Sequence, residues 1–250
     1  MISVKNISKS FNGVKILDDI SFDFHKGKTN LIIGKSGSGK SVLTKCMVGL
    51  LQPDSGDVFY QDTKLSTLKN KEKKEIRKQL GMLFQGSALF DSFSVEDNVA
   101  FPLKMFTSFS GNEITERVNF CLNRVDIINK NELFPSELSG GMQKRVAIAR
   151  AIAMQPKYLF CDEPNSGLDP VTAIVIDELI KEITEEYDIT TVVITHDMNS
   201  VLEIGDNILF IDSGKNKWQG SKDEILDSDV KELNDFIYVS KFLKQLKKNR

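Results

Sequence analysis

The 250-residue sequence has no surplus of positive charge, because 33 Lys and Arg stand against 35 Asp and Glu, a formal net charge of −2. Proteins that hold nucleic acid by its phosphates usually carry such a surplus, so no nucleic-acid partner is expected. Cysteine is also scarce, and the three residues Cys46, Cys121 and Cys161 are far apart. This spacing fits neither a disulfide framework nor a zinc site, and it favours a reducing compartment.

Long apolar runs are missing as well. No stretch approaches the roughly 18 apolar residues that a membrane-spanning helix needs, and residues 1–6 lack the apolar core of a signal peptide. We therefore expect a cytoplasmic chain, and a transport function would require another chain to supply the pore. The rest of the composition, 40% hydrophobic and 27% charged, is that of a globular protein, and the length of 250 residues suffices for one large domain or a domain with an inserted lobe.

The spacing of apolar residues predicts an α/β protein. Alternating apolar residues predict strands within the first 24 residues, and residues 29–33 form an apolar strand that leads into a glycine-rich loop. After the loop, apolar residues at intervals of three and four predict a helix that reaches Leu50. Further strands are predicted at 57–61, 80–85, 158–161 and 191–195, and a hairpin over 206–220 that turns at Ser213-Gly214.

Helical spacing dominates from Val95 to Ala153, which predicts a helical lobe inserted in the α/β core. Residues 69–78 are rich in charge, and glutamates alternate with the lysines there. This pattern favours a solvated helix face over a nucleic-acid patch. The predicted division is a single domain over 1–250, with core segments 1–90 and 154–222, a helical subdomain 91–153 and a helical extension 223–250.

A glycine-rich loop carries the first chemical motif. Residues 34–41, Gly-Lys-Ser-Gly-Ser-Gly-Lys-Ser, fit the pattern G-x-x-x-x-G-K-[ST] between a predicted strand and a predicted helix. Glycines let backbone N–H groups surround phosphate oxygens, and the helix N-terminus adds partial positive charge. Lys40 is expected on the β- and γ-phosphates, and the Ser41 hydroxyl on Mg²⁺. The expected phosphate-binding residues are Gly34, Ser36, Gly37, Ser38, Gly39, Lys40, Ser41 and Val42. The motif alone fits a kinase, a GTPase or an ATPase.

An acidic pair, Asp162-Glu163, follows an apolar strand. The first carboxylate can hold Mg²⁺, directly or through water, and the second can polarise an attacking water molecule. Acidic residues also favour the start of a helix, so capping is the alternative interpretation.

Five further motifs give a resemblance that covers nearly the whole chain. Leu138-Ser139-Gly140-Gly141 is similar to the signature of ATP-binding cassette (ABC) transporter subunits, and Ser166-Gly167-Leu168-Asp169 to their D-loop. Met142 departs from the commoner glutamine that ends the signature. Gln85 stands at the Q-loop position, His196 at the switch position and Phe11 at the adenine-stacking position. For His196 and Phe11 a structural role is the alternative interpretation.

The resemblance implies a P-loop ATPase core with a mainly parallel sheet, an N-terminal antiparallel β subdomain and an inserted helical subdomain. In this family two subunits close head to tail on two ATP molecules. Ser139, Gly140 and Gly141 would then contact the γ-phosphate held by the partner's phosphate loop. Glu163 would be the general base, His196 would hold the γ-phosphate, Gln85 would link Mg²⁺ to the helical lobe, and Asp169 would lie at the subunit interface. Mg²⁺ would be held by Ser41, Gln85 and Asp162, and the implied catalytic set is Glu163, His196, Gln85 and Lys40.

The segment after the Q-loop narrows the resemblance. Residues 84–92, Phe-Gln-Gly-Ser-Ala-Leu-Phe-Asp-Ser, and 98–103, Asn-Val-Ala-Phe-Pro-Leu, are similar to Mla-type ATPases, which serve phospholipid transport with MCE-type lipid-binding proteins. The small and apolar residues from Gly86 to Phe90 suit docking of a membrane permease, or else they pack the helical lobe. The implied location is the cytoplasmic face of the inner membrane.

The end of the chain combines an apolar stripe, which includes Phe236, Val239, Phe242, Leu243 and Leu246, with several lysines. Contact with the partner ATPase, contact with anionic lipid and a plain solvated helix are all open there. For the whole chain, the alternatives to lipid transport are an ATPase of a small-solute importer, a soluble ABC protein without a membrane partner, and a nucleotide sensor. The intact Glu163 and His196 oppose the sensor.

Overall fold

The structure is a computed structural model in which residues 1–238 are described. It consists of two compact units. Of the described residues, the first contains 1–68 and 194–238, and the second contains 69–193. In the predicted C-terminal stripe, Phe236 is buried on the last described helix. The rest of that stripe and the lysines from Lys241 onward lie outside the described residues.

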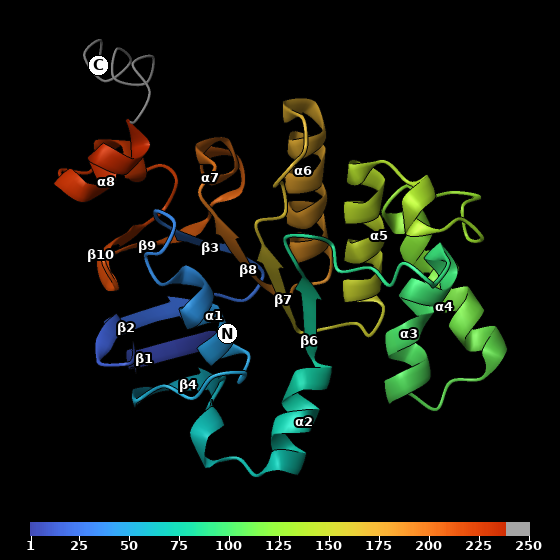
Figure 1. Ribbon diagram of the computed structural model, residues 1–250, viewed down its shortest axis with the longest axis horizontal. Coiled ribbons are helices and arrows are strands. Elements are labelled where there is room, and N and C mark those ends of the chain that lie inside the picture. The colour runs from blue at the N-terminus through green and yellow to red at the C-terminus, as the bar shows by residue number, and fades with distance from the viewer. Residues whose placement is uncertain (239–250) are drawn as a thin grey trace. The chain divides into compact units, whose positions relative to one another are not determined.

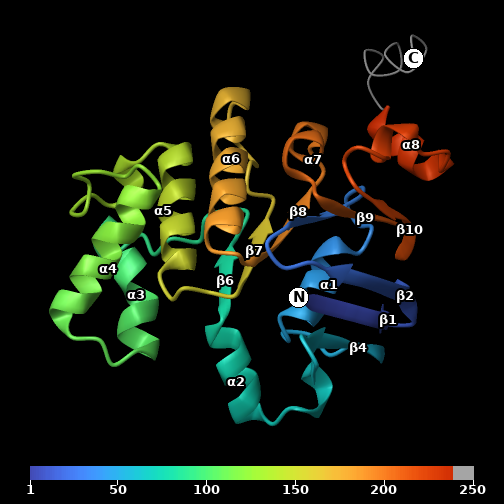
Figure 2. The same ribbon diagram turned by 180° about the vertical axis from the view of Figure 1, so that it is seen from behind.

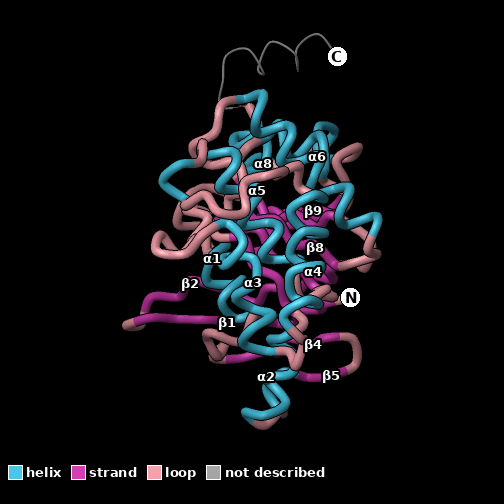
Figure 3. Tube along the Cα trace, turned by 90° about the vertical axis from the view of Figure 1, so that its right-hand side faces the viewer, coloured by secondary structure: helices cyan, strands magenta, loops and turns pink. Residues whose placement is uncertain are grey.

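An antiparallel sheet begins the first unit, and Figure 3 shows its first two strands, in magenta, as a long hairpin. Apolar side chains such as Ile2, Val4 and Ile20 are buried on one face, as their alternation predicts. Asn12 and Gly13 join the first two strands with positive φ angles of 49° and 78°, which suits a tight hairpin turn. The strand order is β2 (Val14–Phe24), β1 (Ile2–Phe11), β4 (Ser55–Tyr60), β5 (Thr63–Lys64).

The first unit also contains a buried parallel pair, β3 (Thr29–Ile33) and β9 (Asn207–Asp212). β10 (Lys215–Gly220) runs antiparallel to β9, which confirms the predicted hairpin and its turn at Ser213-Gly214. The remaining elements of the unit are α1 (Lys40–Met47), η1 (Leu65–Thr67), α7 (Met198–Ile204), η3 (Ile225–Asp227) and α8 (Lys231–Ile237).

The predicted extent of the first helix was wrong, because α1 ends at Met47 and does not reach Leu50. Gly49 takes a left-handed φ of 73°, and the amides of Leu50 and Leu51 both donate to the carbonyl of Lys45, which terminates the helix. The Leu50 side chain is 64% exposed. Two predicted strands also end early, at Tyr60 and at Leu83.

In the second unit, β6 (Leu80–Leu83) and β7 (Tyr158–Asp162) pair in parallel, and the order continues to β8 (Thr190–Thr195). Both β7 and β8 are apolar and buried, as expected for strands covered on two faces. The charged helix α2 (Asn70–Lys78) has no buried residue, which confirms the solvated face. The boundary between the two units falls within β8, after Val193.

Helices make up the middle of the second unit. Figures 1 and 2 show three of them side by side, with α6 (Pro170–Glu186) beside the last of the three. Serines fix their starts: Ser94, Ser110 and Ser139 each accept a hydrogen bond from a backbone amide in the first turn of the helix that they cap. The elements are α3 (Val95–Phe106), α4 (Gly111–Arg124), η2 (Pro135–Glu137) and α5 (Gly140–Ile152).

Candidate functional site

The glycine-rich loop lies in the first unit between the buried strand β3 and helix α1. Gly34 needs to be glycine, because its φ is 149° and a Cβ there would collide with the carbonyl oxygen of Ile211. Gly39, with φ 111°, would bring a Cβ to 2.9 Å from the carbonyl oxygen of Ile16. At both positions a side chain would collide with neighbouring backbone, so the turn requires glycine there.

The start of α1 has the properties of an anion site. Gly39 occupies the N-cap, no side chain caps the helix, and its first turn holds no acidic residue. The first backbone N–H groups of such a helix lack intrahelical partners and attract negative charge. Ser38 is also buried, and its hydroxyl oxygen has no hydrogen-bond partner. These features favour a bound oxyanion.

Lys40 is 7% exposed and curls back over the loop. Its ammonium group donates to the carbonyl of Gly34 at 2.7 Å and to that of Lys35 at 3.1 Å. The loop thus holds a buried cation next to the free helix N-terminus. Ser41, in the first turn of α1, is exposed, as are Ser36 and Gly37, whereas Val42 is half-buried.

Phe11 and His196 are the other predicted site residues of the first unit. Phe11 ends β1, its side chain is 42% exposed, and the Lys9 ammonium lies 5.5 Å from the centre of its ring. His196 is exposed between β8 and α7, where Asp197 caps the helix by accepting from the amide of Asn199. Both residues are exposed, and their roles stay predictions.

The acidic pair lies in the second unit, at the carboxyl end of β7. Asp162 is the last residue of the strand, and both carboxylates are half-buried. Glu163 has a positive φ of 48°, which is unfavourable for a residue with a side chain. A turn in which the Ser166 amide donates to the Glu163 carbonyl at 3.1 Å holds this conformation. Such strain is common where a side chain has to be aimed at a substrate.

Gln85 and the buried Lys144 complete this part of the site. The Gln85 amide donates to the Ser166 hydroxyl at 3.2 Å, and the Lys144 ammonium donates to the Gln85 carbonyl. Burial lowers the pKa of Lys144, while the nearby Cys161, Asp162 and Glu163 raise it. In the second unit, the buried ammonium group of Lys144 thus lies near both Gln85 and the two carboxylates of the acidic pair.

Gly140 and Gly141 form the first residues of α5, after the capping Ser139. A Cβ on Gly141 would lie 2.6 Å from the methyl carbon of Thr172, so glycine lets the start of α5 approach α6 closely. Asp169 caps α6, since its carboxylate accepts from the amides of Val171 and Thr172 at 3.1 and 3.0 Å. The hydroxyl and amide of Thr172 lower the pKa of Asp169. An interface role of Asp169 stays a prediction.

A family model described as ABC transporter matches residues 17–166. The chain belongs to the ABC transporter family. It is an ATP-binding subunit and an ATPase of that family, and the predicted α/β fold, with an antiparallel N-terminal sheet and mostly parallel strands in the core, is confirmed.

Three comparisons give the degree of similarity. The methionine import ATP-binding protein MetN of Clostridium tetani is 43% identical over 215 residues, which are 86% of this chain and 67% of that relative. The intermembrane phospholipid transport system ATP-binding protein MlaF of Haemophilus influenzae is 40% identical over 228 residues, 91% of this chain and 86% of that relative. A solved dimeric structure of the ATP-binding cassette MJ0796, in a post-hydrolysis state with ADP and Pi, is 31% identical, with a TM-score of 0.80, and covers 89% of this chain and 99% of that one.

Sequence reasoning missed that Lys144 binds the carbonyl of Gln85 and that Arg150 binds those of Ser87 and Ala88. For Lys144 the signal was present in the periodicity of α5, because Lys144, Ala147, Ile148 and Ala151 share one helix face and are all buried. A lysine at a position that the helical period assigns to the core is rarely buried without a specific acceptor. The acceptor itself, a backbone carbonyl 59 residues away, could not be read from the sequence.

Proposed function

We propose that this ATPase powers phospholipid transport through a separate membrane permease that works with an MCE-type lipid-binding protein. The observation that carries the proposal is the sequence from Phe84 to Leu103, which resembles the Mla-type ATPases. The 40% identity to MlaF over 91% of this chain supports it. No helix among residues 1–238 is long and apolar enough to cross a membrane.

In the proposed mechanism the glycine-rich loop holds the phosphates of ATP. The uncapped start of α1 and the buried ammonium group of Lys40 supply positive charge where the β- and γ-phosphates bind. Gly34, Ser36, Gly37, Ser38 and Gly39 provide backbone N–H groups, and Val42 follows in the first turn of the helix. Phe11 is proposed to stack on the adenine with its exposed ring.

The donor set fits a magnesium ion. Ser41 offers an exposed hydroxyl, Gln85 an exposed amide oxygen and Asp162 a half-buried carboxylate, all of them oxygen ligands. Mg²⁺ is typically held through one or two protein oxygens together with substrate phosphates and water. When bound, the ion would neutralise charge on the phosphates. Its ligands here are proposed to be Ser41, Asp162 and Gln85.

Hydrolysis requires a base and groups that orient water. Glu163 is proposed as the general base, because a half-buried carboxylate follows β7 directly and stands on a backbone with an unfavourable positive φ. His196 is proposed to hold the γ-phosphate and the attacking water. Gln85 is proposed to couple the state of the bound nucleotide to the position of the helices α3 to α5.

One copy does not contain a complete site in this proposal. Ser139, Gly140 and Gly141 form an exposed or half-buried helix start, and α5 has no acidic residue in its first turn. We propose that this surface binds the γ-phosphate held by a second copy, with Asp169 at the same interface. The dimeric structure of MJ0796 supports the pairing of two copies. A homodimer on the cytoplasmic face of the inner membrane would then drive the permease.

The 43% identity to MetN favours a second candidate, the ATPase of an importer for a small polar solute such as an amino acid. Both candidates use the same nucleotide chemistry and differ in partners. A small-solute importer would work with a soluble binding protein, whereas lipid transport would require an MCE-type partner.

Affinity purification of the chain from detergent-solubilised membranes, followed by mass spectrometry of bound proteins and lipids, separates these functions. We expect a multi-span permease, an MCE-type protein and phospholipid. A permease with a soluble binding protein and no lipid would replace the lipid proposal by the importer. Recovery of no membrane protein would contradict both and favour a soluble ABC protein.

A further inference from the structure

The segment that follows Gln85 is held by side chains from α5. The guanidinium group of Arg150 donates to the carbonyl of Ser87 at 2.9 Å and to that of Ala88 at 2.8 Å. Ser87 and Ala88 have positive φ angles of 61° and 49°. Two consecutive residues with a Cβ rarely take this conformation unless surrounding groups impose it. Arg150 therefore binds the backbone at the point where its conformation is least favourable.

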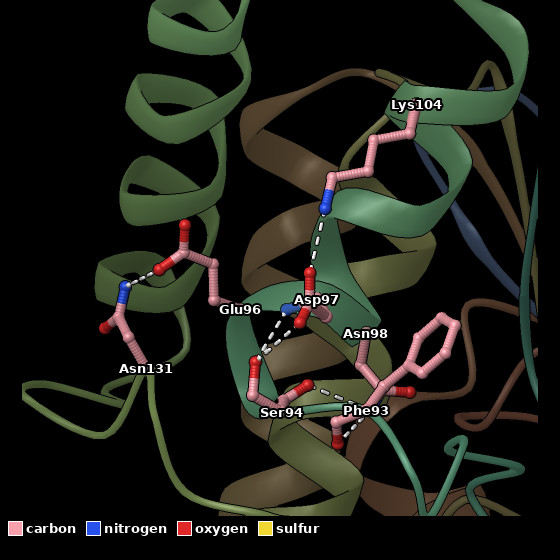
Figure 4. Close-up of polar contacts among 7 residues, drawn as sticks. All are labelled: Phe93, Ser94, Glu96, Asp97, Asn98, Lys104 and Asn131. Carbon is pink, nitrogen blue, oxygen red and sulfur yellow. Dashed lines mark hydrogen bonds and ion pairs between the residues drawn. The ribbon is translucent and has the colours of Figure 1, made fainter.

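Asn98 on α3 holds the other end of the same segment. Its side chain is fully buried, and its amide donates to the carbonyls of Phe90, Phe93 and Ser94 while its oxygen accepts from the amide of Phe90 at 2.8 Å. Figure 4 shows Asn98 directed toward Phe93 and Ser94, in the same view as the exposed ion pair between Lys104 and Asp97. The Asn98 amide thus bonds four backbone groups, and its oxygen also accepts from the Arg150 guanidinium at 3.5 Å.

Lys144 provides a second attachment to α5. It is 3% exposed, and its ammonium donates to the carbonyl of Gln85. Lys144 and Arg150 are six residues apart on the helix, about 9 Å along its axis. The two cations thus bind the carbonyls of Gln85, Ser87 and Ala88, so residues 85–88 are attached to α5 at two points.

We propose that Lys144 and Arg150 are positioning residues that fix the backbone of residues 85–88 to α5. Gln85 and the glycines at the start of α5 then keep one relative position during the ATPase cycle. The side chain of Gln85 is exposed and has one hydrogen bond to Ser166, so its placement depends on how firmly its backbone is held. The inference rests on the proposed ATPase mechanism, in which Gln85 contacts the bound nucleotide and its metal.

Arg117 provides a matched control. It lies in the same unit, is half-buried like Arg150, and donates to two backbone carbonyls, those of Ala153 at 2.9 Å and Ile152 at 2.8 Å. Arg117→Gln and Arg150→Gln therefore remove the same kind of contact, a bidentate guanidinium on two carbonyls. Only Arg150→Gln releases the segment after Gln85.

The experiment measures the ATPase activity of the full transporter complex and the hydrogen exchange of backbone amides 85–93 in each variant. For Arg150→Gln we expect faster exchange in 85–93, and a kcat lowered about tenfold with KM for ATP within about twofold, because misplaced groups mainly affect the chemical step. For Arg117→Gln we expect exchange in 85–93 and kcat to match the parent. Arg150→Lys, which keeps a cationic donor, should recover part of both losses.

Two results would overturn the inference. Exchange in 85–93 that is unchanged in Arg150→Gln would show that the guanidinium does not hold the segment. An equal loss of kcat in the two glutamine variants would show that Arg150 contributes only to the general stability of the fold and has no positioning role. If Arg150→Gln does not fold, Arg150→Lys and Lys144→Met give the same readouts. An inactive parent complex would contradict the proposed function instead, and the exchange measurement would still test the attachment.

Discussion

The side-chain amide of Gln85 donates a hydrogen bond to the hydroxyl of Ser166 at 3.2 Å. This bond links the segment after β6 to the turn after Glu163, whose carbonyl accepts from the Ser166 amide. Ser166 thereby connects Gln85, which is proposed to contact the metal, with Glu163, which is proposed as the base.

Ser166→Ala tests that connection. The bond joins two partly exposed groups, so we expect the free energy of unfolding to fall by less than about 1 kcal/mol. Turnover should fall several-fold, because Gln85 loses its partner. Chemical denaturation and steady-state ATPase assays measure the two quantities. Ser136→Ala, at an exposed serine in η2, is the control and should change neither. A parental kcat in Ser166→Ala would remove Ser166 from the mechanism.

Glu163→Gln should bind ATP but not turn it over, because the amide cannot accept the proton of the attacking water. General-base catalysis is worth about 10²–10⁴-fold, and kcat should fall by that order. Gel filtration with ATP should detect an accumulated dimer. Glu116→Gln, at an exposed position of α4, should keep parental activity. A Glu163→Gln protein that hydrolyses ATP at the parental rate would contradict the assignment of the base.

Phe90→Asp should disconnect the ATPase from its permease. The ring is 41% exposed, lies 4.8 Å from the ring of Phe101 between centroids, and has the Arg150 guanidinium 5.8 Å away. The introduced carboxylate stands at an exposed position and can stay hydrated, so the fold should survive. Co-purification with the permease should be lost, while a circular dichroism spectrum should match the parent.

Phe120→Asp is the matched control, because Phe120 is also exposed, at 47%, and has the Arg117 guanidinium 4.9 Å from its ring centre. This variant should retain the permease. Equal retention of the permease by both variants would contradict the docking role of Phe90.

Gly34→Ala should weaken nucleotide binding by roughly 5- to 150-fold. At the present φ of 149°, the added Cβ would collide with the carbonyl oxygen of Ile211. The loop would therefore have to move, at a cost of about 1–3 kcal/mol or more. Gly111→Ala is the control, since a Cβ there would meet no atom within 4 Å. Calorimetric titration with ATP measures the difference. Parental affinity in Gly34→Ala would show that the loop tolerates a side chain.

The sequence predicted the features that local patterns encode. The glycine-rich loop, the hairpin at Ser213-Gly214 and the apolar strands β7 and β8 all follow from short-range periodicity or turn chemistry. The early end of α1 was missed, although Gly49 stood there as a stop signal. The Asn12-Gly13 hairpin was missed too, although that dipeptide is a strong turn signal.

Contacts between distant segments could not be predicted. The positive φ of Glu163 arises from the turn that ends at Ser166. The burial of Lys144 depends on the carbonyl of Gln85, in the loop that follows β6. Neither has a local signature in composition or spacing. The roles of Glu163, His196 and Phe11 came from the order of motifs along the chain and stay predictions, of which Glu163→Gln tests the first.

All three cysteines are free and buried. Burial raises the pKa of the Cys46 and Cys121 thiols to about 11 and raises that of Cys161 as well, so the folded protein presents almost no thiolate at neutral pH. A cysteine introduced on the surface would therefore be the main target for a maleimide dye. Fluorescent or spin labels can be attached at chosen positions without first removing the native thiols, and subunit closure can be followed in an otherwise unaltered chain.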